Sequence, residues 1–406
     1  MPTVWRRPGH EFDAAAAPVL PAEVYSDPVV FAAEMRHLFA PDAGLVYLSH
    51  DLLLPPRGHQ RADSDPRIVL TRDGDAVTAL ANVCTHACRP LVDDDRAVSH
   101  TWIRCPYHDW SFRGDGSLIG GGNIDFGEGV EGDATKHALA LPSFDLLSWR
   151  GFHFGVDSAH IDAYRTDLAR IDDDFEARGI GDWLDLDGWT TAAAHDDPYR
   201  GDWKAFVEVF GDCYHVPPYH PGLASFVDCG SIEWTFGDNF HAQFLELSDE
   251  QGRRSSHYSE WSDGLQQYYA RRGDPAPRMA VGWVGIYPNL MFEVYNGLKV
   301  LSVVVPVGPD EFVNRVHYCV PDDMERLVPG LPAAIIAAYD ETVIEDRALV
   351  ERRSEGLRAA SSLGLDIERY HVNLSGDATL EAGVAHFHDW WTRRRVTQVG
   401  NGPTAE

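Results

Sequence analysis

Two short clusters of cysteine and histidine constrain this chain more than any other feature. Cys84 and His86 form the first cluster, Cys105 and His108 form the second, and residues 87–104 separate them. Each cluster supplies one thiolate and one imidazole. A [2Fe-2S] centre whose second iron is held by two histidines needs these ligands, and they come from two loops that close on the cluster. The pattern therefore predicts an iron–sulfur site built from both clusters.

A structural zinc ion is the alternative, because zinc also binds two cysteines and two histidines. Zinc sites usually pair cysteine with cysteine and histidine with histidine, whereas each cluster here contains one of each. Pro106 and an aromatic-rich flank accompany the second cluster. The mixed order favours the iron–sulfur interpretation over zinc.

Residues 82–91, 105–112 and 115–118 resemble the Rieske family in its ring-hydroxylating oxygenase type; they read NVCTHACRPL, CPYHDWSF and DGSL. The resemblance implies that a Rieske [2Fe-2S] cluster is bound by Cys84, His86, Cys105 and His108. One departure is Cys88, which follows Ala87 where relatives usually have Arg-Gly. The second loop has Tyr107 where the partner of a stabilising disulfide would stand, so we expect no bridge there.

Length and composition limit the remaining possibilities. The 406 residues far exceed the roughly 100 that a lone Rieske domain needs, so at least one further domain is expected. No apolar run approaches the roughly 18 residues of a membrane span, and the N-terminus lacks the apolar core of a signal peptide. Six cysteines do not make a disulfide framework, which agrees with the reducing cytoplasm. A net charge of −29 argues against nucleic acid as a partner.

The hydrophobic pattern predicts three regions. Residues 1–44 form a lead-in with a helix over 28–39, residues 45–155 form a β-rich module, and residues 156–406 form a mixed region. The resemblance implies that the module is the Rieske domain and that the mixed region is the catalytic domain. The catalytic region is expected to contain helices over 162–179, 203–215 and 331–359, and strands over 232–247, 281–295, 299–306 and 315–320. The fold class is therefore α+β. The family resemblance implies a Rieske β-sandwich followed by a helix-grip (START-like) domain with an antiparallel sheet.

The segment 202–223 carries the prediction of a second metal site. Asp212 and His215 are three residues apart, so they share a face of the helix expected over 203–215. Pro217 and Pro218 should end this helix, and a turn can then fold His220 beside His215. Two converging histidines supply two ligands of the 2-His-1-carboxylate triad that binds Fe(II). A pair of ordinary loop histidines would be the simpler interpretation in a chain without the Rieske clusters.

The third iron ligand must come from a distant part of the chain. The helix expected over 331–359 carries many acids, but Asp346 is the one acid on an apolar stripe formed by Tyr339, Val343, Val350 and Leu357. A carboxylate on a buried stripe is costly unless a cation meets it, and iron is such a cation. We therefore predict Asp346 as the third ligand. The other acids of the helix, Glu341, Glu345, Glu351 and Glu355, are predicted to form solvated ion pairs with neighbouring arginines.

The resemblance also implies how the two sites cooperate. A separate ferredoxin or flavin reductase supplies electrons, the cluster passes them on, and the iron activates O2 to hydroxylate a small aromatic substrate. The rival reaction is the N-demethylation or hydroxylation of a methylated or quaternary ammonium compound. In the family a head-to-tail homotrimer brings the cluster of one subunit to the iron of the next, a ring with heterologous interfaces. His108 then hydrogen-bonds to Asp212 of its neighbour, which makes Asp212 a catalytic residue. An electron carrier or sensor with an empty second site is the non-enzymatic alternative.

The substrate class stays open at the level of sequence. Trp283, Tyr287 and Phe292 are candidates for the pocket wall, with Gly285 making room between the first two. A small aromatic ring fits such a wall, and a methylated or quaternary ammonium compound held by cation–π contacts is the alternative. Glu246 or Glu293 would assist a cation, but the sequence places neither in the pocket.

Overall fold

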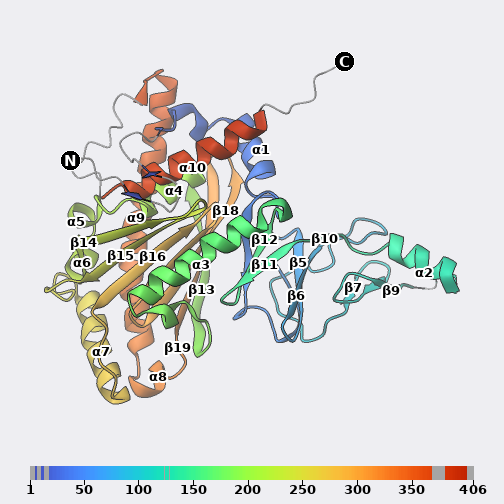
Figure 1. Ribbon diagram of the computed structural model, residues 1–406, viewed down its shortest axis with the longest axis horizontal. Helices are drawn as coiled ribbons and strands as arrows, with labels where there is room; N and C mark the ends of the chain where they lie inside the picture. Colours follow the sequence, from blue (N-terminus) through green and yellow to red (C-terminus); the bar gives the residue numbers. More distant parts are fainter. Residues whose placement is uncertain are drawn as a thin grey trace. The chain divides into compact units, whose positions relative to one another are not determined.

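The computed structural model describes residues 18–122, 124–127, 129–367 and 380–399, together with two backbone segments at 5–6 and 11–12. The chain divides into two compact units (Figure 1). One unit comprises Ala40–Arg165, and the other comprises Met1–Phe39 and Thr166–Glu406. The lead-in thus belongs to the same unit as the C-terminal part of the chain, and the unit boundaries differ from the expected ones by five to ten residues.

The unit 40–165 is built from small antiparallel sheets in the orders β10-β6-β5-β4, β11-β12-β3 and β7-β8-β9. Its strands are β3 (Leu45–His50), β4 (Arg57–Arg61), β5 (Ile68–Asp73), β6 (Ala76–Ala81), β7 (Ile103–Arg104), β8 (Ser111–Phe112), β9 (Leu118–Gly120), β10 (Ser143–Phe144), β11 (Leu146–Trp149) and β12 (Phe152–Val156). Helix α2 (Gly129–Ala138) and the short turn η3 (Ser158–His160) complete it. Leu48, Leu70 and Ala79 form one core, and a second core surrounds the two cluster cysteines.

The larger unit contains one seven-stranded antiparallel sheet in the order β13-β19-β18-β17-β16-β15-β14. The strands are β13 (Trp189–Arg200), β14 (Val227–Phe236), β15 (Phe240–Leu247), β16 (Met279–Ile286), β17 (Leu290–Tyr295), β18 (Leu298–Gly308) and β19 (Glu311–Pro321). Strands β1 (Trp5–Arg6) and β2 (Glu11–Phe12) pair separately near the N-terminus. The predicted strand regions are confirmed, except that two of them each contain a hairpin of two strands and β13 was not predicted.

Helices lie on both faces of this sheet (Figure 1). They are η2 (Ala22–Tyr25), α1 (Pro28–His37), α3 (Ile161–Ala177), η4 (Gly181–Leu184), α4 (Trp203–Phe210), α5 (Val216–Tyr219), α6 (Pro221–Phe226), α7 (Ser256–Arg272), α8 (Met324–Leu327), α9 (Leu331–Ser362) and α10 (Ala382–Val399). Phe175 of α3 packs edge-on against Phe244 of β15 with ring centroids 5.0 Å apart. Helices α4 and α9 cover the opposite face. Among the described helices, none combines the length and apolar character that a membrane span requires.

A buried ionic cluster fixes the lead-in to the larger unit. Lys204 Nζ lies 2.8 Å from Glu34 Oε1 and 2.8 Å from Asp202 Oδ1, and all three side chains are buried. The indole nitrogens of Trp203 and Trp391 donate to the same Glu34 carboxylate. The fully buried face of α1 therefore includes Glu34, an acid that the apolar pattern of the sequence alone would leave in solvent.

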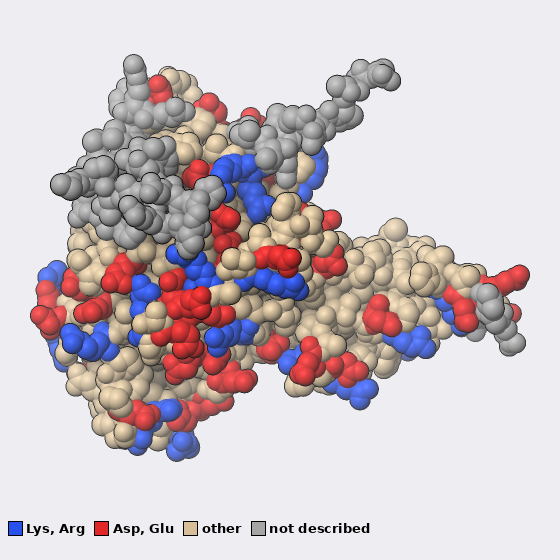
Figure 2. Space-filling model, in the orientation of Figure 1, with Lys and Arg blue, Asp and Glu red and all other residues tan. Residues whose placement is uncertain are grey.

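The acidic excess of the chain is distributed over its surface. On the face drawn in Figure 2, acidic and basic side chains are interspersed.

Candidate metal centres and active site

The two cysteines and two histidines of the predicted cluster site lie together in the unit 40–165. Cys84 and Cys105 are buried in one apolar core. Burial raises the pKa of the Cys84 thiol, and the neighbouring thiol of Cys105 raises it further. The imidazoles of His86 and His108 are exposed, with ring centroids 4.6 Å apart. Two inner thiols and two outer imidazoles match a cluster whose histidine-bound iron faces the surface. These residues therefore fit a Rieske [2Fe-2S] centre.

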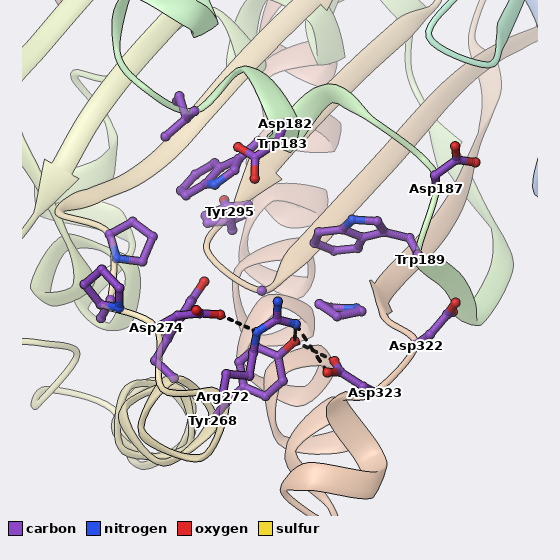
Figure 3. A pocket seen from close by; sticks show the side chains of 18 of the residues that line it. Asp182, Trp183, Asp187, Trp189, Tyr268, Arg272, Asp274, Tyr295, Asp322 and Asp323 are labelled. Atoms are coloured by element: carbon purple, nitrogen blue, oxygen red, sulfur yellow. Dashed lines mark hydrogen bonds and ion pairs between the residues drawn. The ribbon is translucent and has the colours of Figure 1, made fainter.

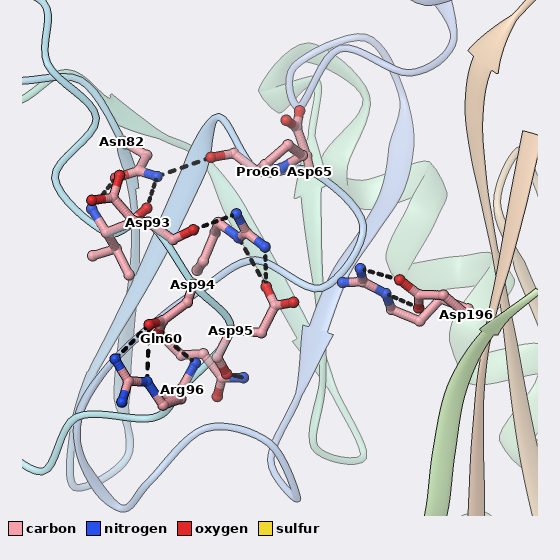
Figure 4. Close-up of polar contacts among 12 residues, drawn as sticks. Gln60, Asp65, Pro66, Asn82, Asp93, Asp94, Asp95, Arg96 and Asp196 are labelled. Atoms are coloured by element: carbon pink, nitrogen blue, oxygen red, sulfur yellow. Dashed lines mark hydrogen bonds and ion pairs between the residues drawn. The ribbon is translucent and has the colours of Figure 1, made fainter.

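The side chain of Asn82 holds the first cluster loop in place (Figure 4). Its Nδ2 donates to the carbonyl oxygens of Pro66 (2.9 Å) and Val92 (2.8 Å), and its Oδ1 accepts from the amides of Leu91 and Val92. All four bonds are made by one buried amide, so the loop cannot shift without leaving polar atoms unpaired.

The second loop is positioned by stacking and by a backbone turn. Trp110 stacks on His86 with centroids 4.8 Å apart, and the amide of Cys105 donates to the Trp110 carbonyl oxygen. Cys88 is an exposed free thiol, as expected from the absence of a cysteine at position 107.

In the larger unit, His215, His220 and Asp346 bring one ligand atom each to a common point. The two Nε2 atoms lie 3.1 Å apart, His220 Nε2 lies 2.9 Å from Asp346 Oδ1, and His215 Nε2 lies 3.5 Å from the same oxygen. Within the described part of the chain, these three side chains are close enough together to hold a single metal ion. Two imidazoles and one carboxylate are the donor set of a non-heme Fe(II) site with open positions.

A carboxylate lies behind each histidine, within ion-pair distance of His215 and within hydrogen-bonding distance of His220. Asp212 Oδ2 lies 3.2 Å from His215 Nδ1, and Glu345 Oε2 lies 2.6 Å from His220 Nδ1. Each Nε2 is thereby left for the metal, the arrangement usual for histidine ligands. Burial opposes protonation of His215, but Asp212 and Asp346 raise its pKa to about 9. A site that attracts positive charge this strongly fits a dication, which replaces the protons on the rings.

The local backbone differs from the prediction at this site. Helix α4 ends at Phe210 with Gly211 as its C-cap, so Asp212 and His215 do not share a helix face. They meet because Asp212 Oδ1 accepts hydrogen bonds from the amides of Tyr214 (2.6 Å) and His215 (3.3 Å) in a turn. The prediction that Pro217 and Pro218 break a helix is also wrong: they lie in the first turn of α5, where the missing amide hydrogens cost nothing.

Glu345 corrects a second expectation. The sequence predicts that it forms a solvated ion pair, but it contacts His220, next to the predicted ligand Asp346. Glu355 does form the expected exposed pair with Arg352. Successive residues of a helix point in directions about 100° apart. Glu345 and Asp346 can therefore both reach His220 only if the imidazole lies between these two directions, at the edge of the apolar face of α9.

A cavity of about 60 Å³ opens beside the three predicted iron ligands. Its other walls are Val209, Phe210, Asp212, Val216, Leu223, Trp283, Glu293, Tyr295, Tyr339 and Thr342. Glu293 is the acid of this wall that does not contact a histidine. It is 7% exposed and accepts hydrogen bonds from the hydroxyls of Tyr295 (3.0 Å) and Tyr339. Burial raises the pKa of Glu293 to about 8, although both tyrosines oppose the shift.

Two of the three predicted wall residues lie elsewhere. Trp283 lines the cavity, but the Tyr287 hydroxyl lies between the buried rings of His241 (2.7 Å) and His386 (3.2 Å). Phe292 precedes Glu293 on β17 and so points to the other face of the sheet. The space beside Gly285 is filled by the ring of His241, and a Cβ there would lie 2.6 Å from it.

A second, larger cavity of about 760 Å³ lies in the same unit (Figure 3). Tyr295 lines both cavities. Its walls include Trp183, Trp189 and five aspartates, of which Asp274 and Asp323 form ion pairs with Arg272. None of the predicted site residues contributes to it.

Comparisons with known proteins agree with both centres. A model of the Rieske [2Fe-2S] domain matches residues 46–124, and a model of the ring hydroxylating alpha subunit catalytic domain matches residues 186–396. The putrescine 2-hydroxylase of Ralstonia nicotianae is 30% identical over 92% of this chain and 94% of its own length. The carnitine monooxygenase oxygenase subunit of Escherichia coli K12 is 25% identical over 91% and 92%.

Solved structures share the fold. A quaternary ammonium Rieske monooxygenase superposes with a TM-score of 0.71 at 20% identity, covering 94% of this chain and 96% of that one. Naphthalene 1,2-dioxygenase from Rhodococcus sp. gives 0.67 at 16% identity, covering 93% and 94%. The first domain therefore carries a [2Fe-2S] cluster, and the catalytic domain binds a mononuclear iron. This chain belongs to the Rieske non-heme iron oxygenases, enzymes that take electrons from a partner protein and react O2 with a small organic molecule.

Proposed function

We propose that this oxygenase is a monooxygenase that hydroxylates a small aliphatic amine, whose ammonium group binds Glu293. The iron is held by His215, His220 and Asp346, and the cluster by Cys84, His86, Cys105 and His108. When bound, the iron supplies the activation of O2. The observation that carries the choice of substrate is the buried carboxylate of Glu293 in the wall of the iron cavity.

Glu293 has hydrogen-bond donors but no cationic side chain beside it. Its partners are two tyrosine hydroxyls, and no described lysine or arginine forms an ion pair with it. A buried carboxylate without a counter-charge is costly, and here the cost appears as a pKa raised to about 8. An ammonium group in the cavity would supply the missing charge, and the rings of Trp283, Tyr295 and Tyr339 would add cation–π contacts.

The size of the cavity and the relatives support the same substrate class. About 60 Å³ is far below the roughly 300–1,000 Å³ of sites for drug-sized ligands, so a polycyclic ring does not fit. Relatives that cover most of this chain act on putrescine, carnitine or glycine betaine. A small aliphatic amine therefore replaces the aromatic ring as the proposed substrate; it shares the cationic group, but not the methylation, of the ammonium compound that the sequence leaves as the alternative.

Asp212 is proposed to connect neighbouring subunits of a homotrimer. One of its oxygens contacts His215 Nδ1, yet its side chain is 22% exposed. Tyr214 and Tyr219, in the same segment of the chain, are large exposed aromatic residues, which supports an interface with another copy of the chain. His108 is an exposed imidazole and has the hydrogen-bonding group that would meet Asp212 across this interface.

The test is a substrate panel with a matched pair of variants. Enzyme loaded with cluster and iron is supplied with NADH and a surrogate ferredoxin reductase, and products from aliphatic amines and from aromatic acids are identified by mass spectrometry. Glu293→Gln keeps the shape of the side chain and removes its charge, and it is expected to raise KM for amines by roughly 10-fold or more. Glu246→Gln alters an exposed acid on β15 outside the cavity and should change nothing. Hydroxylated aromatic acids with inert amines would refute the proposal.

A further inference from the structure

We propose that Asn314 and Ser302 form a second polar subsite, which binds the distal nitrogen of a linear diamine while its first ammonium group is held at Glu293. The inference rests on the proposed function, because it extends the same cavity. It rests separately on a second compartment whose wall contains a buried, unpaired hydrogen-bond acceptor.

The second compartment has a volume of about 40 Å³ and adjoins the iron cavity. The two compartments share the wall residues Val209, Phe210, Glu293, Tyr339 and Asp346. The second is otherwise lined by Tyr199, Phe206, Ser302, Asn314 and Val343. Glu293 thus borders both spaces, and a molecule bound to it can extend past Asp346, away from His215 and His220, toward Ser302 and Asn314.

Asn314 has one polar atom without a partner. Its side chain is 2% exposed, and Nδ2 donates to Ser302 Oγ at 3.4 Å. Oδ1 is buried and accepts no hydrogen bond from the described residues. Buried side-chain oxygens are almost always paired, so an orphan acceptor in a cavity wall marks a place for a ligand donor. An ammonium group, with three donors and no acceptor, satisfies it.

The register of the strands places Glu293 and the pair Ser302 and Asn314 on the same face of the sheet. Glu293 of β17 pairs with Val300 of β18, and Asn314 of β19 pairs with Val304 of β18. Val300, Ser302 and Val304 alternate onto one side, so Glu293, Ser302 and Asn314 face the same way. Crossing two strand spacings and four residues puts the Cα atoms of Glu293 and Asn314 on the order of 17 Å apart.

This separation favours an extended molecule with a polar group at each end. The side chains of Glu293 and Asn314 and two hydrogen bonds take up part of the distance, and a short methylene chain fills the rest. The intervening wall is mainly aromatic and aliphatic, which suits such a chain. A compact quaternary ammonium compound would occupy only the end at Glu293. The carboxylate of Glu293 and Oδ1 of Asn314 are both hydrogen-bond acceptors, so the ligand needs a donor group at each end. A linear diamine has an ammonium group at both ends.

The test compares three four-carbon compounds that differ at one end: butane-1,4-diamine, butylamine and 4-aminobutanoate. Their affinities for the anaerobic, iron-loaded enzyme are measured by calorimetry, together with KM. The wild-type enzyme is expected to bind the diamine at least about 10-fold more tightly than butylamine. Asn314→Leu, a substitution of similar size, should abolish this preference by weakening the binding of the diamine.

A second variant keeps the test decisive if the first does not fold. Asn314→Asp places a carboxylate at the same position, so it should retain or increase the preference for the diamine and reject 4-aminobutanoate. An equal diamine preference in wild type and Asn314→Leu would overturn the subsite. So would tighter wild-type binding of 4-aminobutanoate than of the diamine, since the amide would then be presenting Nδ2. If no amine binds or reacts at all, the proposed function itself fails, which is a different result from either.

Discussion

Glu345 and Asp346 are neighbours in sequence, yet they contact opposite nitrogens of the same imidazole. Asp346 Oδ1 lies 2.9 Å from His220 Nε2, where a metal ion would bind, and Glu345 Oε2 lies 2.6 Å from His220 Nδ1. Asp346 is half-buried and lies against both histidines, which lower its pKa although its partial burial acts in the opposite direction. One carboxylate is therefore placed to bind iron directly, whereas the other orients the ring that binds it.

Substitution of the two acids should separate these roles. Asp346→Ala is expected to remove the mononuclear iron and leave two irons per chain with an unchanged Rieske EPR signal. Glu345→Gln keeps the ligand set and should weaken iron binding by about 10- to 100-fold, the usual effect of removing a carboxylate behind a histidine ligand. Glu355→Gln, which alters only an exposed ion pair with Arg352, is the control. Iron is measured by metal analysis and by titration with Fe(II). Full iron occupancy in Asp346→Ala would show that this residue is not a ligand.

The sequence predicts site residues that stand in an unusual local pattern. It does not predict those whose role depends only on their position in the folded protein. His215, His220 and Asp346 could be proposed because two histidines beside prolines and one acid on an apolar stripe are unusual. Glu293 and Glu246 could not be told apart, because strand alternation gives the face of a residue and not the cavity it borders. Asn314 gave no signal at all, since an orphaned acceptor exists only in the folded state.

At the scale of elements, the type of most segments was predictable and the ends were not. The long helix α9 and the pairs of strands follow from periodicity. The end of α4 was misplaced by five residues, because Gly211 and the cap at Asp212 are stronger stop signals than the prolines that follow. The burial of Glu34 could not be predicted, because nothing in the local sequence indicates that Lys204 meets it. An ion pair between residues far apart in sequence cannot be predicted from the hydrophobic pattern of one segment.

Strand β18 carries a buried lysine that makes stability depend on pH. Lys299 Nζ lies 3.6 Å above the ring of Trp189 and donates to the carbonyl oxygen of Asp185. Burial lowers the pKa of Lys299 to about 7, whereas an unfolded chain restores a value near 10.4. Between these values the unfolded state binds more protons, so this residue makes the fold more stable as pH rises from 7 toward 10 and less stable as pH falls.

Lys299→Met should remove this dependence. The urea midpoint of the variant is expected to exceed that of the wild type most near pH 7, and the difference should shrink as pH rises to 9. The slope attributable to the residue approaches roughly 1.4 kcal/mol per pH unit between its two pKa values. Other groups titrate equally in both proteins, so the difference between them isolates Lys299. A difference that stays constant from pH 7 to 9 would show that Lys299 is charged in the folded protein throughout this range.

At the scale of the whole molecule, the proposed trimer makes each active site depend on two chains. Asp212 contacts the iron-site residue His215 and is 22% exposed, and the exposed residues Tyr214 and Tyr219 follow it two and seven positions later in the sequence. His108 is exposed on the other unit. A head-to-tail ring uses both surfaces on every subunit and leaves neither uncovered, which is the closed solution for a heterologous interface.

Mixed trimers test this arrangement directly. His86→Ala removes a cluster ligand and His215→Ala removes an iron ligand, so each variant alone should be inactive. If electrons cross between subunits, trimers that contain both variants should be active. Such trimers are made by co-expressing the two variants in equal amounts, or by unfolding and refolding them together. Random assembly gives one productive neighbour pair in four, hence about a quarter of the wild-type activity. Asp212→Asn introduced into the His86→Ala chain, which supplies the intact iron, should abolish the recovery even when added Fe(II) restores the iron content of that chain to that of the parent variant. The same substitution in the His215→Ala chain, which supplies only the cluster, should not. Mixtures that stay inactive although they contain mixed trimers by mass would place electron transfer within one chain.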